Sequence, residues 1–132
     1  MYKVITPTTP EELDKYYDLR WRVLREPFQR PKGAEQDEYD QVGQHRMVIN
    51  QAGDAVAVGR VHFNSAEEAQ IRFMAVAPEY RGEGHGVAII YALELAARND
   101  GAKHVVINSR DNTIGFYKKC GYQVAEEADT VN

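Results

Sequence analysis

The fold is decided by residues 71–87, which read IRFMAVAPEYRGEGHGV. The apolar run from Ile71 to Ala77 predicts a strand, and the spacing of apolar residues from Val87 to Arg98 predicts a helix. The glycines between them allow a tight turn and let a ligand approach backbone N–H groups. Because the first N–H groups of a helix lack internal partners and attract anions, this order of elements predicts a phosphate-binding loop.

The spacing of the glycines narrows the class of phosphate ligand. No Gly-Lys-Ser/Thr follows, so the loop is not that of the common nucleotide hydrolases, and a nucleotide-binding switch is disfavoured. The third glycine of a dinucleotide fingerprint would fall at Val87 or Ile89. Arg81 adds a fork of N–H donors suited to pyrophosphate.

Arg-x-x-Gly-x-Gly after a strand resembles the acyl-CoA pyrophosphate loop of the GNAT superfamily of N-acyltransferases. Residues 112–122, NTIGFYKKCGY, are similar to the family's other signature, an asparagine followed by Phe-Tyr, a glycine and an aromatic residue. The two motifs lie in the family's order and at its spacing, and the resemblance covers roughly residues 45–127.

Composition bounds the class of protein. The 132 residues are expected to form a single domain, 1–132, with ordinary shares of hydrophobic (43%) and charged (27%) residues. The net charge of -4 argues against nucleic acid as a partner. No apolar run approaches the roughly 20 residues that span a membrane, and the start has no signal-peptide pattern. The single cysteine, Cys120, fits a reducing cytoplasm.

The pattern along the chain predicts a mixed α/β (α+β) fold. The resemblance implies a mostly antiparallel sheet with a central β-α-β unit, splayed parallel strands and helices on both faces, with the family's last strand missing after residue 127. We expect a short helix within residues 35–42 of the irregular stretch 27–44. The expected strands are 2–5, 45–50, 55–63, 70–77, 103–108 and 122–126, and the expected longer helices begin at Pro10, at Gly86 and at Asn112.

The resemblance also implies a cofactor site. The strand before the loop would pair its backbone with pantetheine amides, and the Val76 N–H would donate to the thioester oxygen. Asn112 would bond pantetheine or only cap its helix, Lys119 would face the phosphorylated ribose or solvent, and His85 is expected to face solvent beside the phosphates. The residues assigned to the cofactor are Met74, Ala75, Val76, Arg81, Gly82, Glu83, Gly84, His85, Gly86, Val87, Asn112, Phe116, Tyr117 and Lys119.

Tyr117 is the side chain expected to act in the chemistry. Acyl transfer from a thioester expels a thiolate, which a nearby phenol can protonate. The competing interpretation is a tyrosine that packs its helix against the sheet, a role that we assign to Phe116. Cys120 has no evident base beside it and is interpreted as a packing residue rather than a nucleophile.

The acceptor side is expected between residues 19 and 40. The stretch LRWRVLREP at 19–27 and the acidic residues after it resemble a GNAT subgroup with an LRxxVLRxP helix end. The acids would favour a cationic amine, unless they form a solvated loop or pair with Arg20, Arg22 or Arg25. The general base is left open among Glu35, Asp37, Glu38, His45, His62 and a water chain.

The leading hypothesis is an N-acyltransferase that moves an acetyl group from acetyl-CoA to a primary amine of a small molecule or peptide by direct attack, with no metal. The alternative is a catalytically weak acyl-CoA-binding regulatory module. An open edge at residues 122–126 also predicts a homodimer with the C-terminal region near its interface.

Overall fold

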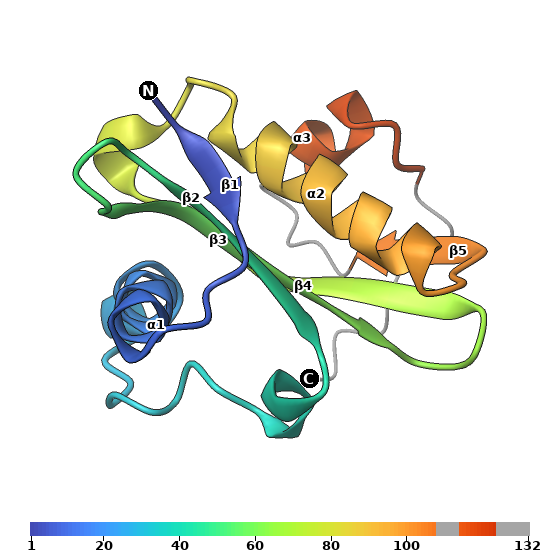
Figure 1. Ribbon diagram of the computed structural model, residues 1–132, viewed down its shortest axis with the longest axis horizontal. Helices are drawn as coiled ribbons and strands as arrows, with labels where there is room; N and C mark the ends of the chain where they lie inside the picture. The colour runs from blue at the N-terminus through green and yellow to red at the C-terminus, as the bar shows by residue number, and fades with distance from the viewer. Residues whose placement is uncertain (108–113, 124–132) are drawn as a thin grey trace.

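The computed structural model describes residues 1–107 and 114–123 and has a mixed α+β fold, as expected (Figure 1). A five-stranded sheet has the order β1-β2-β3-β4-β5, in which β4 and β5 are parallel and the other pairs are antiparallel. The elements are β1 (Lys3–Ile5), α1 (Pro10–Leu24), η1 (Glu26–Phe28), η2 (Glu38–Gln41), β2 (Gln44–Ile49), β3 (Ala55–Phe63), β4 (Glu68–Val76), η3 (Pro78–Tyr80), α2 (His85–Asn99), β5 (His104–Ile107) and α3 (Ile114–Lys119).

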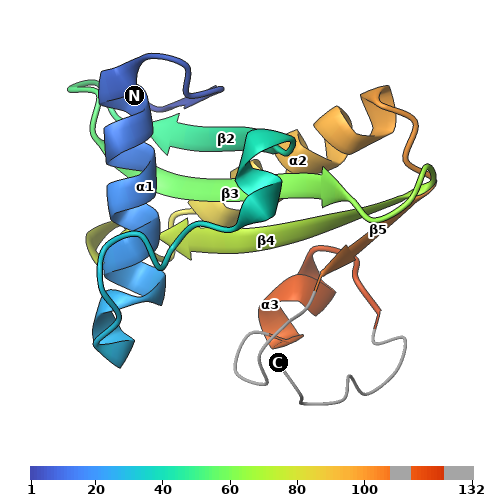
Figure 2. The same ribbon diagram turned by 90° about the horizontal axis from the view of Figure 1, so that it is seen from below.

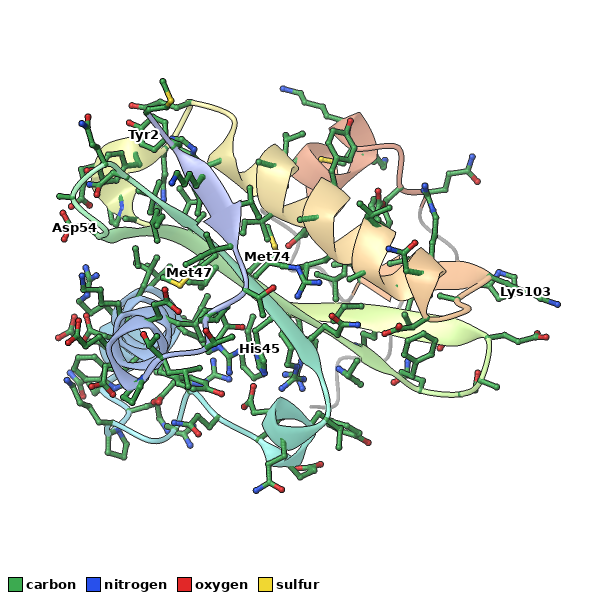
Figure 3. All side chains as sticks on the ribbon, viewed as in Figure 1. Tyr2, His45, Met47, Asp54, Met74 and Lys103 are labelled. Atoms are coloured by element: carbon green, nitrogen blue, oxygen red, sulfur yellow. The ribbon has the colours of Figure 1, made fainter. Side chains whose placement is uncertain are left out.

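Helices cover both faces of the sheet. The helix α1 and the short η2 lie on one face, and α2 lies on the other (Figures 1 and 2). Each face has its own apolar core, with Tyr16 and Leu19 of α1 on the first and Ile89 and Leu93 of α2 on the second. Met47 lies on the α1 side of the sheet and Met74 on the α2 side (Figure 3).

The helix ends follow the sequence signals. At the start of α1, the Thr9 hydroxyl accepts from the Glu12 N–H (3.1 Å), and the Glu12 carboxylate accepts from the Thr9 N–H (3.1 Å). This capping box confirms the expected helix start. At the end of α2, Gly101 has φ +100°, and the Ala102 N–H donates to the Ala97 carbonyl (2.9 Å), as in a glycine-terminated helix.

The parallel strand β5 is paired with β4 along its whole described length, from Glu68↔His104 to Ile71↔Ile107, while β4 continues to Val76. Because residues 108–113 lie outside the described residues, the splay of the two strands that the resemblance implies stays a prediction. Most of the expected strand 122–126, from residue 124 onward, lies outside the described residues, as do the expected dimer contacts of that region.

A β-bulge interrupts β4 shortly after Ile71, its last residue that pairs with β5. The register changes between Val58↔Ala75 and Arg60↔Arg72, so Phe73 and Met74 together oppose Gly59. Phe73 has φ +58°, a left-handed conformation that costs free energy for a residue with a side chain. The extra residue bends the strand and re-aims the side chains on either side of it.

Gly59 is required by close packing of α2 on the bulge. A methyl group at this position would lie 2.6 Å from Ile89 Cγ2 and 2.9 Å from both Leu93 Cδ1 and Met74 Sδ. All three neighbours belong to a packed interior, so none can move away freely.

We therefore expect Gly59→Ala to lower the free energy of unfolding by about 1–3 kcal/mol, the usual cost of overpacking. Urea denaturation monitored by circular dichroism measures this change. The control is Gly115→Ala in α3, where a methyl group would meet no described residue within 4 Å. Equal stability of the two variants would show that α2 does not depend on a glycine at position 59.

Candidate functional site

The glycine loop forms the turn that the sequence predicts between β4 and α2. Gly82 (φ +83°) and Gly84 (φ +89°) take the left-handed conformation, and a Cβ on either would meet nothing within 4 Å. The first turn of α2 carries no side-chain cap, so its N–H groups face the space in front of Gly84. An open backbone cradle at the start of a 15-residue helix fits an anionic ligand such as pyrophosphate.

His85 differs from its predicted position. The expectation of a solvent-facing imidazole is wrong, because His85 is only 7% exposed. Its ring centroid lies 4.4 Å from that of Tyr2, and its Nε2 lies 3.0 Å from the Glu83 carboxylate. The Tyr2 hydroxyl donates to the same carboxylate oxygen at 3.4 Å. Tyr2, which directly precedes β1, therefore packs against the side chains of the loop (Figure 3). The imidazole of His85 is occupied by these contacts, so a ligand could reach only its backbone.

At the end of β4, some backbone groups are directed away from β3 and are available to a ligand. The Ala77 N–H donates to the Val56 carbonyl (2.9 Å), so that pair is hydrogen-bonded, and pairs alternate along an antiparallel ladder. Ala75 therefore directs its backbone groups to β3, whereas Val76 directs its own away from β3. The Val76 carbonyl accepts from Arg81 Nε (3.4 Å).

Three elements that carry predicted site residues meet at Gly86. A Cβ at Gly86 would lie 3.0 Å from Phe116 Cζ of α3 and 3.6 Å from Val76 Cγ2 of β4. The missing side chain thus lets α3 approach the first turn of α2. The predicted phosphate loop, the end of β4 and the helix that carries Tyr117 are brought to one place.

Tyr117 is half-buried beside this junction, with its ring centroid 5.3 Å from that of Phe116. Burial raises the pKa of its phenol above the ordinary value, so the group holds its proton at neutral pH. Burial also raises the pKa of the Cys120 thiol, which disfavours a thiolate nucleophile there. Lys119 is exposed, and Asn112 lies outside the described residues.

On the other face of the sheet, two fully buried arginines hold the 26–43 segment, which contains η1 and η2. Arg20 of α1 donates to the Asp40 carboxylate (2.9 Å) and the Glu35 carbonyl (2.9 Å). Arg60 of β3 donates to the Asp37 carboxylate (2.5 Å) and to Asp40 (3.1 Å). A buried charge is costly unless it is paired, so these contacts fasten the segment to the sheet.

This pairing changes the interpretation of the acidic residues. The expected attraction of a cationic amine is wrong for Asp37 and Asp40, since arginines neutralise both. Of the arginines considered, Arg20 pairs with Asp40, Arg22 pairs with Asp18, and Arg25 donates to the backbone carbonyls of residues 24 and 34. Burial alone would raise the pKa of Asp37, but the hydrogen bonds and charge of Arg60 outweigh it and lower the pKa. Asp37 is therefore a weak base.

Of the other candidates for the general base, some have partners within the fold and one is exposed to solvent. The Glu35 carboxylate is buried and accepts from the Gly33 N–H (2.7 Å), while Glu38 is exposed on η2. His62 stacks on Tyr39 with ring centroids 4.3 Å apart. Both ring nitrogens of His45 have hydrogen-bond partners within the fold.

The partners of His45 fix its tautomer. Its Nε2 lies 2.9 Å from the Asp40 carbonyl, which can only accept, so Nε2 carries the proton. Its Nδ1 lies 2.6 Å from the Tyr16 hydroxyl, which accepts from Arg20 (2.9 Å) and donates to the Gly59 carbonyl (3.0 Å). Burial lowers the pKa of His45, and burial with the charge of Arg60 lowers that of His62.

Sequence reasoning missed the bulge and the buried Arg60, whereas the pairing of Arg20 with an acid of the 26–43 segment was one of its alternatives. No glycine marks Phe73, so its left-handed backbone had no signal in the sequence. Gly59-Arg60 inside an apolar strand was the available signal, because a glycine within a strand often marks a bulge or a close approach.

We expect stability to fall with acid in a way that follows these histidines. An imidazole whose pKa is lowered by folding stays neutral in the native state, while the unfolded chain takes up a proton near its ordinary pKa of about 6.5. The stabilisation is complete above that pH and is lost as the pH falls toward the native pKa. The free energy of unfolding should therefore decrease between about pH 7 and about pH 5.

Urea denaturation across that range checks this expectation. His45→Gln and His62→Gln should each flatten the decrease, and the exposed His104→Gln is the matched control. An unchanged slope in both variants would show that neither imidazole is held neutral by the fold.

The comparisons with known proteins agree with this geometry. Residues 13–122 match the model of the acetyltransferase (GNAT) family. An uncharacterized N-acetyltransferase of Bacillus subtilis, YjcF, is 28% identical over 127 residues, which cover 96% of this chain and 89% of that protein. Among solved structures, a putative N-acetyltransferase from Lactobacillus plantarum superposes with a TM-score of 0.84 at 23% identity, covering 99% of this chain and 89% of the other. A GNAT family acetyltransferase from Elizabethkingia anophelis with acetyl-CoA bound has a TM-score of 0.71 at 19% identity, with 95% and 78% covered. The chain belongs to the acetyltransferase (GNAT) family and is an acyltransferase whose cosubstrate is acetyl-CoA.

Proposed function

We propose that this protein transfers the acetyl group of acetyl-CoA to a primary amine by direct attack, without a covalent enzyme intermediate. The convergence of β4, α2 and α3 at Gly86 carries the proposal. One ligand that extends from the glycine loop along the edge of β4 would pass all three elements. An acyl-CoA is such an extended ligand. Its pyrophosphate would lie at the loop, and its pantetheine chain, which ends in the thioester, would run along β4.

Each element then has a role in the reaction. The loop, with Arg81, holds the pyrophosphate, and the amine nitrogen attacks the thioester carbonyl carbon. The Val76 N–H, directed away from β3, donates to the oxyanion of the tetrahedral intermediate. Collapse of that intermediate breaks the carbon–sulfur bond, and the Tyr117 phenol gives its proton to the departing thiolate. The attacking nitrogen releases its proton to water, and Tyr117 takes a proton back from water after the products leave.

The acceptor lies, in this proposal, between the part of β4 that follows Ile71 and the 26–43 segment. Its location is supported by the LRxxVLRxP sequence at 19–27, which ends α1 at the start of that segment. None of the described helices is long and apolar enough to cross a bilayer. Action in the cytoplasm and assembly as a homodimer remain predictions from the single cysteine and from the sequence of the C-terminal region.

We expect Gly84→Asp to abolish the binding of acetyl-CoA, because it places a carboxylate where pyrophosphate would lie and adds a side chain at φ +89°. For the wild type, acetyl-CoA at about 100 times its dissociation constant should add about 2.7 kcal/mol to stability and raise the melting temperature. Differential scanning fluorimetry measures the shift.

Gly101→Asp is the matched control, because Gly101 has φ +100° and open space around it but lies at the far end of α2. It should keep the thermal shift of the wild type. An equal response of the Gly84→Asp variant would remove the loop from the cofactor site.

Tyr117→Phe should reduce kcat by about 10²–10⁴-fold, since it deletes the proton donor and keeps the ring. Thiol release from acetyl-CoA with an amine panel measures turnover, and calorimetry measures affinity for CoA, which should hardly change. Full turnover in this variant would assign Tyr117 to packing. A protein that binds acetyl-CoA but turns over no amine would instead be the regulatory binding module.

A further inference from the structure

The bulge places two consecutive residues of β4 on the same face of the sheet. Arg72 reaches Asp37 of the 26–43 segment, and the Phe73 ring lies under Arg20 of α1. The next residue, Met74, packs on the opposite face with α2 (Figure 3). Without the extra residue, strand alternation would separate these side chains.

Four guanidinium groups surround the Phe73 ring, and we call them the arginine cluster. Their central carbons lie at 4.4 Å (Arg20), 4.7 Å (Arg72), 4.9 Å (Arg60) and 5.3 Å (Arg25) from the ring centroid. Such contacts stabilise cations on an aromatic face. Guanidinium groups do not lose their charge in proteins, so four positive charges are gathered around one ring.

Two carboxylates of the described residues pair with the arginine cluster. Asp37 and Asp40 accept from it, the buried Glu35 carboxylate turns to the Gly33 N–H, and Glu38 is exposed on η2. The N–H groups are in excess, because the buried Nε atoms of Arg20 and Arg60 have no hydrogen-bond partner among the described residues.

Arg72 is the member of the arginine cluster that a ligand can reach. Its side chain is 42% exposed, and its Nη1 lies 3.5 Å from Asp37, at the far limit of a hydrogen bond. Directly opposite on β3 stands Arg60, which holds the same carboxylate more closely. The Asp37 carboxylate therefore binds mainly Arg60. The guanidinium of Arg72 keeps N–H donors that no described residue accepts from.

The position of Arg72 along β4 also suits a contact with the acceptor. It follows Ile71, the last residue of β4 that pairs with β5 among the described residues. Arg72 thus lies in the part of β4 that extends past the described part of β5, upstream of the Val76 N–H. An acceptor whose amine meets the thioester there extends its other end past Arg72.

We propose that the acceptor is a primary amine that also carries an oxyanion, a phosphate or a carboxylate, which Arg72 binds within the field of the arginine cluster. The proposal rests on the proposed acetyl transfer and names its substrate class. A guanidinium fork binds either oxyanion through two parallel N–H···O bonds. The second ammonium of a diamine would instead lie beside the like-charged guanidinium of Arg72.

The test compares four small acceptors of similar length with acetyl-CoA: phosphoethanolamine, β-alanine, ethanolamine and 1,3-diaminopropane. We expect kcat/KM for phosphoethanolamine, for β-alanine or for both to exceed that for ethanolamine by about tenfold or more, with diaminopropane the poorest. The first two acceptors distinguish phosphate from carboxylate. Added salt should reduce this preference.

Arg72→Gln should raise KM for the preferred anionic acceptor by about tenfold and narrow its advantage over ethanolamine, while KM for acetyl-CoA stays the same. Arg22→Gln is the matched control, since this exposed arginine pairs with Asp18 on α1, away from the arginine cluster. It should leave the preference intact.

Two results would overturn the inference while the proposed transfer stands: a preference for ethanolamine or diaminopropane, or an equal loss on all acceptors in Arg72→Gln. If no amine is turned over, phosphoethanolamine and β-alanine are each titrated into the CoA-saturated protein in a calorimeter. The heat of binding then tests for the anion site. Binding that is lost in Arg72→Gln supports the anion site, and no binding of either compound contradicts it.

Discussion

The structure depends on the burial of two guanidinium groups between α1, β3 and the 26–43 segment. Arg20 and Arg60 are both fully buried, and Asp40 accepts from each of them. Removing one partner of such a network leaves a buried charge uncompensated, at a typical cost of about 3–5 kcal/mol. The 26–43 segment is poor in regular structure, so this pairing, rather than a backbone ladder, keeps it against the sheet.

The same network explains the unusual backbone of β4. Phe73 bears a left-handed conformation that costs roughly 1–3 kcal/mol, and its ring supports the arginines that hold the segment. The bulge also sets the face on which Arg72 lies. The packing of the 26–43 segment and the re-aimed edge of β4 are thus one arrangement. The loop that we propose for the cofactor leads into α2, which covers the opposite face of the sheet.

Much of the fold and of the cofactor side could be predicted from the sequence. Apolar periodicity, the capping box at Thr9 and the left-handed glycines at 82, 84 and 101 are local signals, and local geometry decided those elements. The acceptor side was harder to predict because its partners are distant in sequence. Arg60 pairs with Asp37, 23 residues earlier, and no pattern of spacing indicates which acid a buried arginine will meet. The burial of His85 likewise depended on Tyr2, which is close in space but lies 83 residues earlier in the sequence.

Amide hydrogen exchange of Arg60→Met tests most directly whether buried guanidinium pairing holds the 26–43 segment in place. We expect amides of residues 35–43 to lose protection, while those in the core of α2 keep the protection of the wild type. Arg22→Met, which removes an exposed arginine from α1, should change neither region. Unchanged protection at residues 35–43 in Arg60→Met, or an equal loss throughout the chain, would show that the buried arginines do not hold this segment.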